Sequence, residues 1–387
     1  MQKKLIAVAV AGALAGPAVA LAQTSTVNIY GTINYEYGHA DGGTNRPDTD
    51  YADTPGGSAI GFRGEEKLGG GLSAWFQCES SADVRGMDQR GICTRNSAIG
   101  FKGAFGNIHF GRWDTPMKRA MNMGTVGGEE TGILGTSFMA FGGSGGADAT
   151  QSNDGLQRQR WKRRETGLQY YESPVFSGFQ VLGAFSSGNF AFDASATSNS
   201  TNAKPRIWSL GATYSAGPLA IGVGYEKHNE FGAFNGATDL DDKGWGASIA
   251  YTFAGKVKVG GTFLRREWET AIGRTLEKDT WTVGVHWKIA GPHELQAIYI
   301  KADDSEGNSL VGIGGNGGAN ASGPDTGADQ FAIYYNYNFS KRTRIQLGYT
   351  RVDNDANSNL VRIGNTPSLL GGGQNQDAWG FRLRHRF

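Results

Sequence analysis

The two cysteines are the residues of this chain best suited to covalent chemistry. Cys78 and Cys93 stand 15 residues apart, and the chain has no other cysteine. In an oxidising compartment such a pair can close one loop and stabilise the fold by restricting the unfolded chain. The alternative is a pair of unreacted thiols. Neither cysteine has a partner at metal-ligand spacing, so the sequence indicates no metal site.

The six histidines offer little for nucleophilic catalysis. A hydrolase needs a nucleophile beside a base, and no Gly-x-Ser-x-Gly or similar signature occurs in the chain. Alternation within their segments predicts that His109 and His385 lie on an apolar face, whereas His286 lies near the end of a strand. We therefore expect no enzymatic activity and no cofactor.

Residues 1–22 have the pattern of a secretory signal peptide. Basic residues precede a run of small and apolar residues that ends at Ala22. Gly16 and Pro17 weaken this run as a membrane anchor, so we expect cleavage after Ala22. Beyond that point no run approaches the roughly 18 to 20 consecutive apolar residues that a spanning helix needs. The sequence predicts an exported protein without a transmembrane helix.

The composition favours a β protein with many turns. The chain has 61 glycines and 20 phenylalanines but only 10 prolines. Its 37 basic and 36 acidic residues nearly balance, and no basic stripe suited to nucleic acid is evident.

Hydrophobicity alternates with a period of two in segments of about ten residues, which is the signature of amphipathic strands. Residues 27–37 and 281–289 are clear examples. In the second segment Trp281 and Val283 alternate with Thr282. Each segment therefore has one apolar and one polar face.

The breaks between these segments alternate between short and long. Seven short turns are expected at 66–70, 104–106, 174–178, 216–218, 254–256, 290–292 and 340–342. Eight long loops are expected at 38–57, 80–95, 113–162, 186–205, 227–243, 268–277, 302–328 and 354–375. Together the seven turns and eight loops separate sixteen strands. If neighbouring strands are antiparallel, all the short turns lie at one end of the sheet, as in outer-membrane barrels.

A barrel of sixteen strands encloses a lumen too wide for side chains to fill, so its polar face can line water. The apolar face then meets lipid, which requires a closed barrel because lipid cannot satisfy an open strand edge. A secreted adhesin is an alternative, in which that face would be buried against protein. Aromatic residues that could form interfacial girdles are Tyr35, Tyr37, Tyr170, Trp208, Tyr214, Trp281 and Trp287.

Several stretches carry a family resemblance. They are residues 60–79, 101–112, 171–179, 335–343 and Arg384-His-Arg-Phe387. Together they resemble the hairpins of Gram-negative general porins, over essentially the whole chain after residue 22. The resemblance implies an all-β, 16-stranded, trimeric, water-filled channel in the outer membrane. Its function would be passive diffusion of small hydrophilic solutes and ions, and its partners would include outer-membrane lipid and lipopolysaccharide.

The resemblance also implies roles for two parts of the chain. The third external loop, residues 113–162, would fold inward and constrict the lumen. Its candidate pore-lining residues are Asp114, Lys118, Glu129, Glu130 and Arg164. Glu129 and Glu130 only approximate the family's acidic loop motif, and a solvated surface is their alternative position. Phe387 resembles the terminal signal by which the outer-membrane assembly machinery recognises its clients.

The lumen face is predicted to be basic. Arg63 alternates with Ile60 and Phe62, which places it on the polar face. The same alternation gives inward basic groups at Lys102, Lys258, Arg266, His286, Lys288, Arg344, Arg382, Arg384 and Arg386, and inward acids at Glu36, Glu79, Glu165 and Glu226. A narrow low-dielectric passage amplifies such an imbalance, so we expect anions to be favoured. The basic run from Arg158 to Arg164 is either an anion-concentrating rim or a solvated patch that holds anionic lipid.

Overall fold

The computed structural model describes residues 26–41, 48–86, 91–126, 135–142, 161–187, 206–230, 240–313, 319–360 and 372–387. Within these residues the protein is all-β apart from two short helices, α2 (Pro116–Met121) and α3 (Ser137–Phe141). Neither helix is long and apolar enough to span a bilayer.

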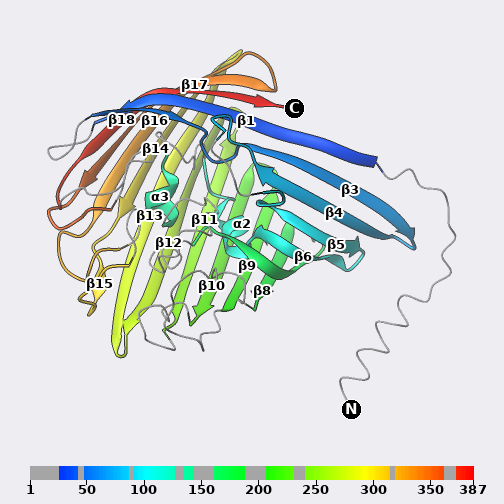
Figure 1. The fold of residues 1–387 in the computed structure, drawn as a ribbon, viewed down its shortest axis with the longest axis horizontal. Helices are drawn as coiled ribbons and strands as arrows, with labels where there is room; N and C mark the ends of the chain where they lie inside the picture. Colours follow the sequence, from blue (N-terminus) through cyan, green and yellow to red (C-terminus); the bar gives the residue numbers. More distant parts are fainter. Residues whose placement is uncertain are drawn as a thin grey trace.

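The strands form one antiparallel sheet that closes on itself (Figure 1). The barrel wall contains sixteen of the labelled strands: β1 (Thr26–Ala40), β3 (Ala59–Gly69), β4 (Leu72–Ser81), β5 (Ser97–Gly103), β6 (Gly106–Asp114), β7 (Arg164–Glu172), β8 (Phe179–Ser186), β9 (Arg206–Ala216), β10 (Leu219–Asn229), β11 (Asp242–Phe253), β12 (Val257–Ala271), β13 (Arg274–Ala290), β14 (His293–Ala302), β16 (Ala328–Asn338), β17 (Thr343–Asn354) and β18 (Gln376–Arg386). Two short strands, β2 (Thr49–Asp53) and β15 (Glu306–Gly307), pair antiparallel with β1 and β13, respectively. The predicted 16-stranded antiparallel barrel is confirmed.

The barrel closes between its first and last strands. β1 pairs with β18 from Thr32↔Arg386 to Ala40↔Ala378. Beyond that ladder, Gly31 and Phe387 exchange two backbone hydrogen bonds, each 3.1 Å long. The terminal residue therefore completes the seam, and its ring lies over Gly31, where no side chain intervenes.

Six of the seven short turns lie where the alternation predicts them, whereas the first lies at Gly70 and Gly71, because β3 continues to Gly69 through most of the turn predicted at 66–70. Gly217 and Gly291 have φ values of 54° and 53°, a left-handed conformation that glycine adopts without steric cost. The predicted long loop at 268–277 is wrong, because β12 and β13 continue as a hairpin with only Ile272 and Gly273 between them. Trp268 and Leu276 face each other across this hairpin and are fully buried, so packing extends the pairing.

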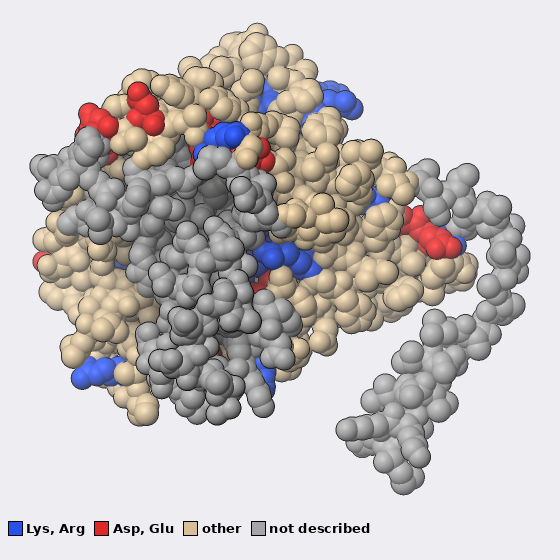
Figure 2. All heavy atoms as spheres, in the orientation of Figure 1, with Lys and Arg blue, Asp and Glu red and all other residues tan. Residues whose placement is uncertain are grey.

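The outer face of the barrel is apolar, as predicted. On β13, Trp281 and Val283 are 50% and 56% exposed, whereas the neighbouring Gly284 is buried on the inner face. Exposed apolar side chains recur at alternate positions around the wall, which suits contact with hydrocarbon. Where Figure 2 shows described residues, most are uncharged, and the charged ones lie in small groups.

Two residues of the expected outer face lie on the inner one. His109 is 0% exposed and its ring stacks on Tyr170 with centroids 4.6 Å apart. Ile108 and Phe110, on either side of His109, are exposed on the outer face, so the intervening side chain must point inward. The lipid-facing position expected for His109 and the girdle position expected for Tyr170 are therefore wrong.

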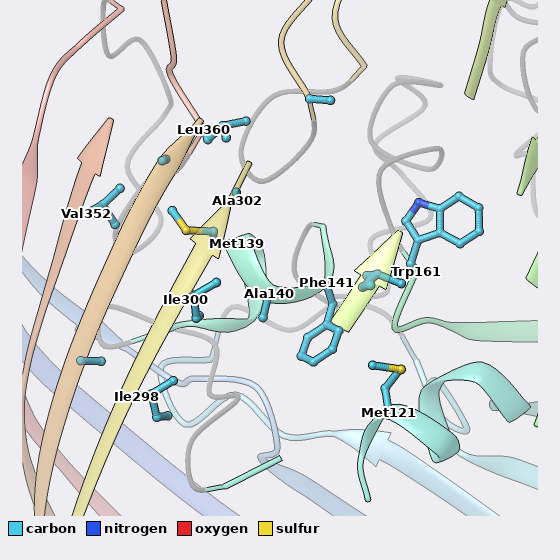
Figure 3. Packing of buried hydrophobic residues seen from close by; sticks show 14 of the residues in the cluster. Met121, Met139, Ala140, Phe141, Trp161, Ile298, Ile300, Ala302, Val352 and Leu360 are labelled. Carbon is cyan, nitrogen blue, oxygen red and sulfur yellow. The ribbon is translucent and has the colours of Figure 1, made fainter. Parts of the chain in front are cut away.

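Inside the barrel, a hydrophobic cluster joins the loop to the wall (Figure 3). Met139 and Phe141 of α3 belong to this cluster, together with Ile298 and Ile300 on the inner face of β14. The wall of an open channel would carry polar side chains at such positions. Here they are apolar because α3 covers them.

Candidate functional site

The functional site is the lumen, and α2 is the part of the long loop best placed to shape it. Thr115 caps the helix by accepting a hydrogen bond from the Lys118 backbone, and Pro116 occupies the first turn. The Met117 backbone donates to Ser209 Oγ on β9 at 3.1 Å, and Ser248 Oγ on β11 donates to the Ala120 carbonyl at 2.7 Å. The helix therefore lies along the inner face of β9–β11 (Figure 1).

Glycines on the inner wall let this segment approach closely. Gly222 and Gly224 on β10 face α2, and Gly260 on β12 faces the chain just after it. None of these glycines is among the site residues predicted from the sequence. The available signal was the recurrence of glycine on the polar face of neighbouring strands, where a water-lined wall has no need of it.

The second half of the loop is attached further around the barrel. Gln330 Nε2 on β16 donates to the Gly135 carbonyl at 2.9 Å. The Trp161 ring stacks on His228 of β10 with centroids 4.4 Å apart. The described parts of residues 113–162 thus contact wall strands from β8 to β16.

Half-buried ion pairs fix the two ends of the loop. Asp114 Oδ1 lies 2.8 Å from Lys118 Nζ and 3.1 Å from Arg164 Nε. Arg119 pairs with Glu172 at 2.7 Å. Burial lowers the pKa of Lys118, and the neighbouring carboxylate of Asp114 opposes that shift. Asp114, Lys118 and Arg164 are therefore brought together as an anchor for α2.

The basic run that ends the loop is not an exposed rim where the structure describes it. Arg163 and Arg164 are 2% and 9% exposed. Arg163 pairs with Glu165 at 2.5 Å. Arg158, Arg160, Glu129 and Glu130 lie outside the described residues.

Several acids on the inner wall are paired with bases. Glu36 accepts from Arg382 Nε at 2.7 Å across the β1–β18 seam, and both side chains are buried. Lys102 Nζ lies 2.5 Å from Glu65. Glu79 pairs with Arg95 at 2.7 Å. These carboxylates contribute little negative field because a positive group neutralises each of them.

Other lumen-facing bases have no carboxylate so close. Arg63 and Lys288 are exposed, and Arg384 is half-buried opposite Arg344 on β17. Among the described residues, Arg63, Lys288 and Arg384 form no salt bridge. Arg63 lies over the Tyr30 ring at 5.1 Å, and Lys258 Nζ donates to the Thr125 carbonyl of the loop at 2.9 Å.

The predicted disulfide between Cys78 and Cys93 is present and ties β4 to the loop that follows it. In the described part of the chain, no group of three or more His, Cys, Asp or Glu side chains could hold a metal ion.

A closed barrel with an apolar exterior, a charged interior and a loop attached inside it defines an outer-membrane channel. The sequence model of the family described as Gram-negative porin matches residues 7–357, and the chain belongs to that family. It is therefore located in the outer membrane and forms a water-filled channel for passive diffusion.

Similar proteins cover the whole chain. Outer membrane porin protein 32 of Delftia acidovorans is 27% identical over 396 residues, covering 100% of both chains. The anion-selective porin from Comamonas acidovorans matches with a TM-score of 0.71 and 20% identity, covering 94% of this chain and 100% of that one. OmpT of Vibrio cholerae in its trimer form matches with a TM-score of 0.62 and 17% identity, covering 94% and 100%.

Proposed function

We propose that this porin prefers anions. The observation that carries the proposal is the pairing pattern of the inner wall: the acids at Glu36, Glu65 and Glu79 have basic partners, whereas Arg63 and Arg384 form no salt bridge among the described residues. The fold likeness to an anion-selective porin rests on 20% identity and supports the fold alone. The proposal therefore depends on the charges of this chain.

A surplus of positive charge acts strongly in a narrow passage, because low-dielectric walls focus the field on the water inside. Arg344 and Arg384 lie directly opposite each other across β17 and β18, with the single carboxylate of Glu294 acting on both. Like charges placed opposite each other in a sheet are unfavourable unless mobile anions or water screen them. Small anions and anionic hydrophilic solutes are therefore the preferred permeants.

The test is the reversal potential of the purified protein in a planar bilayer under a potassium chloride gradient. The wild-type sign should indicate chloride preference. Arg63→Gln and Arg384→Gln should each move the reversal potential toward zero. Lys256→Gln is the matched control, because Lys256 is exposed in the β11–β12 turn outside the lumen. A wild-type potential of the cation-selective sign would refute the proposal.

We further propose that residues 113–162 form the constriction. The attachments of α2 and α3 to the inner wall support this role, because whatever volume the loop occupies is lost to the lumen. Asn122 follows α2 and is exposed, while its neighbours Met121 and Gly124 are buried against the wall. Asn122 therefore faces the water that remains.

Asn122→Cys tests the constriction directly. A charged methanethiosulfonate reagent should attach to this cysteine and lower the single-channel current in steps. Lys256→Cys should react without changing the current, because its side chain is outside the lumen. The wild type should not respond, since its two cysteines are disulfide-bonded. Unchanged current after complete modification of Asn122→Cys would contradict the proposal.

The remaining roles follow the family. We propose that residues 1–22 are a cleaved signal peptide and that the mature chain assembles as a homotrimer in contact with outer-membrane lipid and lipopolysaccharide. Phe387 would act as the recognition signal for the outer-membrane barrel assembly machinery. Gel migration of unheated and heated samples, combined with mass measurement of the detergent complex, tests the trimer. A monomeric native mass would contradict it.

A further inference from the structure

We infer that a glycine-lined groove on the inner wall sets the position of the constriction loop and hence the width of the lumen. Gly222 and Gly260 are the positioning residues. This inference rests on the proposed role of residues 113–162 as the constriction. On this inference the wall strands, and not the loop sequence alone, determine how far the loop projects into the lumen.

The groove is built by strand register. Gly224 on β10 lies directly opposite Gly211 on β9 and Gly246 on β11, which gives a row of three inward glycines. A second row joins Gly260 on β12 to Gly284 on β13. All five point inward, and Gly222 lies on the same face of β10 opposite Ser248, so the wall along this path carries only glycines and small side chains such as Ser248 and Ala250.

The loop follows this path from β9 to β13. A Cβ on Gly211 would lie 2.8 Å from the Pro116 carbonyl oxygen, and one on Gly284 would lie 3.2 Å from Val126 Cβ. Residues 116–126 therefore cross five strands in contact with the backbone of the wall. Any side chain added below them must move either itself or the loop.

Gly222 allows the closest approach. A Cβ there would lie 2.7 Å from the Ala120 carbonyl carbon and closer still to its oxygen, whereas real Cβ atoms keep at least 3.0 Å. That same oxygen accepts the 2.7 Å hydrogen bond from Ser248. The bond can form only if the loop backbone lies directly on the wall. Gly260 on β12 allows the same close approach to the loop. A Cβ there would collide with Gly124 O and lie 2.5 Å from Val126 Cγ2.

Gly224 provides a contrast within the same strand and face. The nearest atom to a Cβ there is Met117 Sδ at 2.5 Å, at the flexible end of a long side chain, and the nearest backbone atom is Met117 Cα at 3.0 Å. Methionine can rotate to relieve the first contact, and the second requires only a small backbone shift. Substitution at Gly224 should therefore displace the loop less than substitution at Gly222, where a backbone carbonyl lies in the way.

The experiment compares Gly222→Ala, Gly260→Ala and Gly224→Ala in planar bilayers and in liposome swelling with sugars of increasing size. Gly222→Ala and Gly260→Ala should lower the single-channel conductance and the size limit. Gly224→Ala should lower both by clearly less. All three must show the heat-modifiable migration of an intact barrel, and if one strong variant fails to fold, the other carries the comparison.

Each outcome decides the matter. Conductance unchanged in Gly222→Ala and Gly260→Ala would overturn the inference, as would an equal fall in Gly224→Ala. If neither strong variant folds, Gly224→Ala and Gly284→Ala carry the test, since backbone contacts of 3.0 Å and 3.3 Å require only a small shift of the loop, and both must lower conductance slightly. If Asn122→Cys modification blocks current while the glycine variants conduct normally, the constriction stands and only the role of the groove fails. If Asn122→Cys modification has no effect, the proposed constriction itself is wrong.

Discussion

Replacing Glu36 with Gln removes one partner of the ion pair that crosses the closing seam of the barrel. Glu36 and Arg382 are opposite residues on β1 and β18 and are 0% and 2% exposed. Arg382 Nε donates to Glu36 Oε2 at 2.7 Å, and a second guanidinium nitrogen binds the same oxygen. Glutamine preserves the shape of the side chain but leaves the buried guanidinium without this negative charge.

The expected cost follows from the distance and the burial. At 2.7 Å and an effective dielectric constant of about 20, the Coulomb attraction is about 6 kcal/mol. Part of it offsets the desolvation of the two ions, and breaking a buried pair typically costs about 3 to 5 kcal/mol. We therefore expect Glu36→Gln to lower the free energy of unfolding by about 3 to 5 kcal/mol. The double variant Glu36→Leu with Arg382→Met should recover much of this loss, because neither charge of the pair is left buried without the other.

The assay is equilibrium unfolding in urea, followed by tryptophan fluorescence in lipid vesicles. The matched control is Glu267→Gln, which breaks the ion pair with Lys243. The Lys243 side chain is 52% exposed, so this variant should change stability little. A Glu36→Gln variant within about 1 kcal/mol of wild type would refute the claim that this pair stabilises the seam.

Three further predictions concern the loop, the disulfide and the terminal residue. Burial lowers the pKa of Lys162 well below its usual range, and the Phe141 ring, whose centroid lies 4.5 Å from Nζ, offsets part of the cost of the charge. Stability should therefore rise with pH from that lowered pKa toward about 10.4, and melting curves of Lys162→Met at several pH values should lack this rise. Replacing Cys78 and Cys93 together by serine should lower the free energy of unfolding in urea by about 3 kcal/mol, and an equal stability of reduced and oxidised wild type would contradict this. Gly31→Leu should displace the Phe387 ring and reduce the fraction of folded barrel on refolding into vesicles, measured by heat-modifiable migration; full refolding yield would show that the ring contact is dispensable.

Alternation in the sequence was sufficient to predict the barrel and the orientation of most wall residues. Trp281 and Val283 are exposed on the outer face and Gly284 is buried inside, as a period of two requires. The disulfide followed from two cysteines at short separation. These features depend on residues that are close together in the chain, so they can be predicted from the sequence alone.

Features that depend on register or on the loop could not be predicted in this way. Trp268 is buried inside the barrel and stabilises the 268–277 hairpin. The alternation of apolar and polar residues is interrupted in this segment, so the sequence predicts a loop in place of two paired strands. Ile300 is apolar on an inward position because α3 covers it. The opposition of Gly224 to Gly211 and Gly246 appears only once the strands are aligned.

The position of the charges shows the same limit. Alternation identified Arg382 and Arg384 equally as inward basic residues. Strand pairing then gives Arg382 a buried carboxylate partner, while Arg384 lies opposite another arginine. The register of the strands therefore decides which basic side chains are neutralised and which can act on permeating ions.

The claim on which all of this rests is that the polar face of the strands lines water and the apolar face meets lipid. Single cysteines at Lys288 and Val283 on β13, in protein reconstituted into vesicles, test it most directly, because Lys288 is exposed on the inner face and Val283 on the outer one. Lys288→Cys should react with a membrane-impermeant charged thiol reagent, whereas a fluorophore on Val283→Cys should be quenched only by a quencher carried on lipid acyl chains. The reverse pattern would contradict the account.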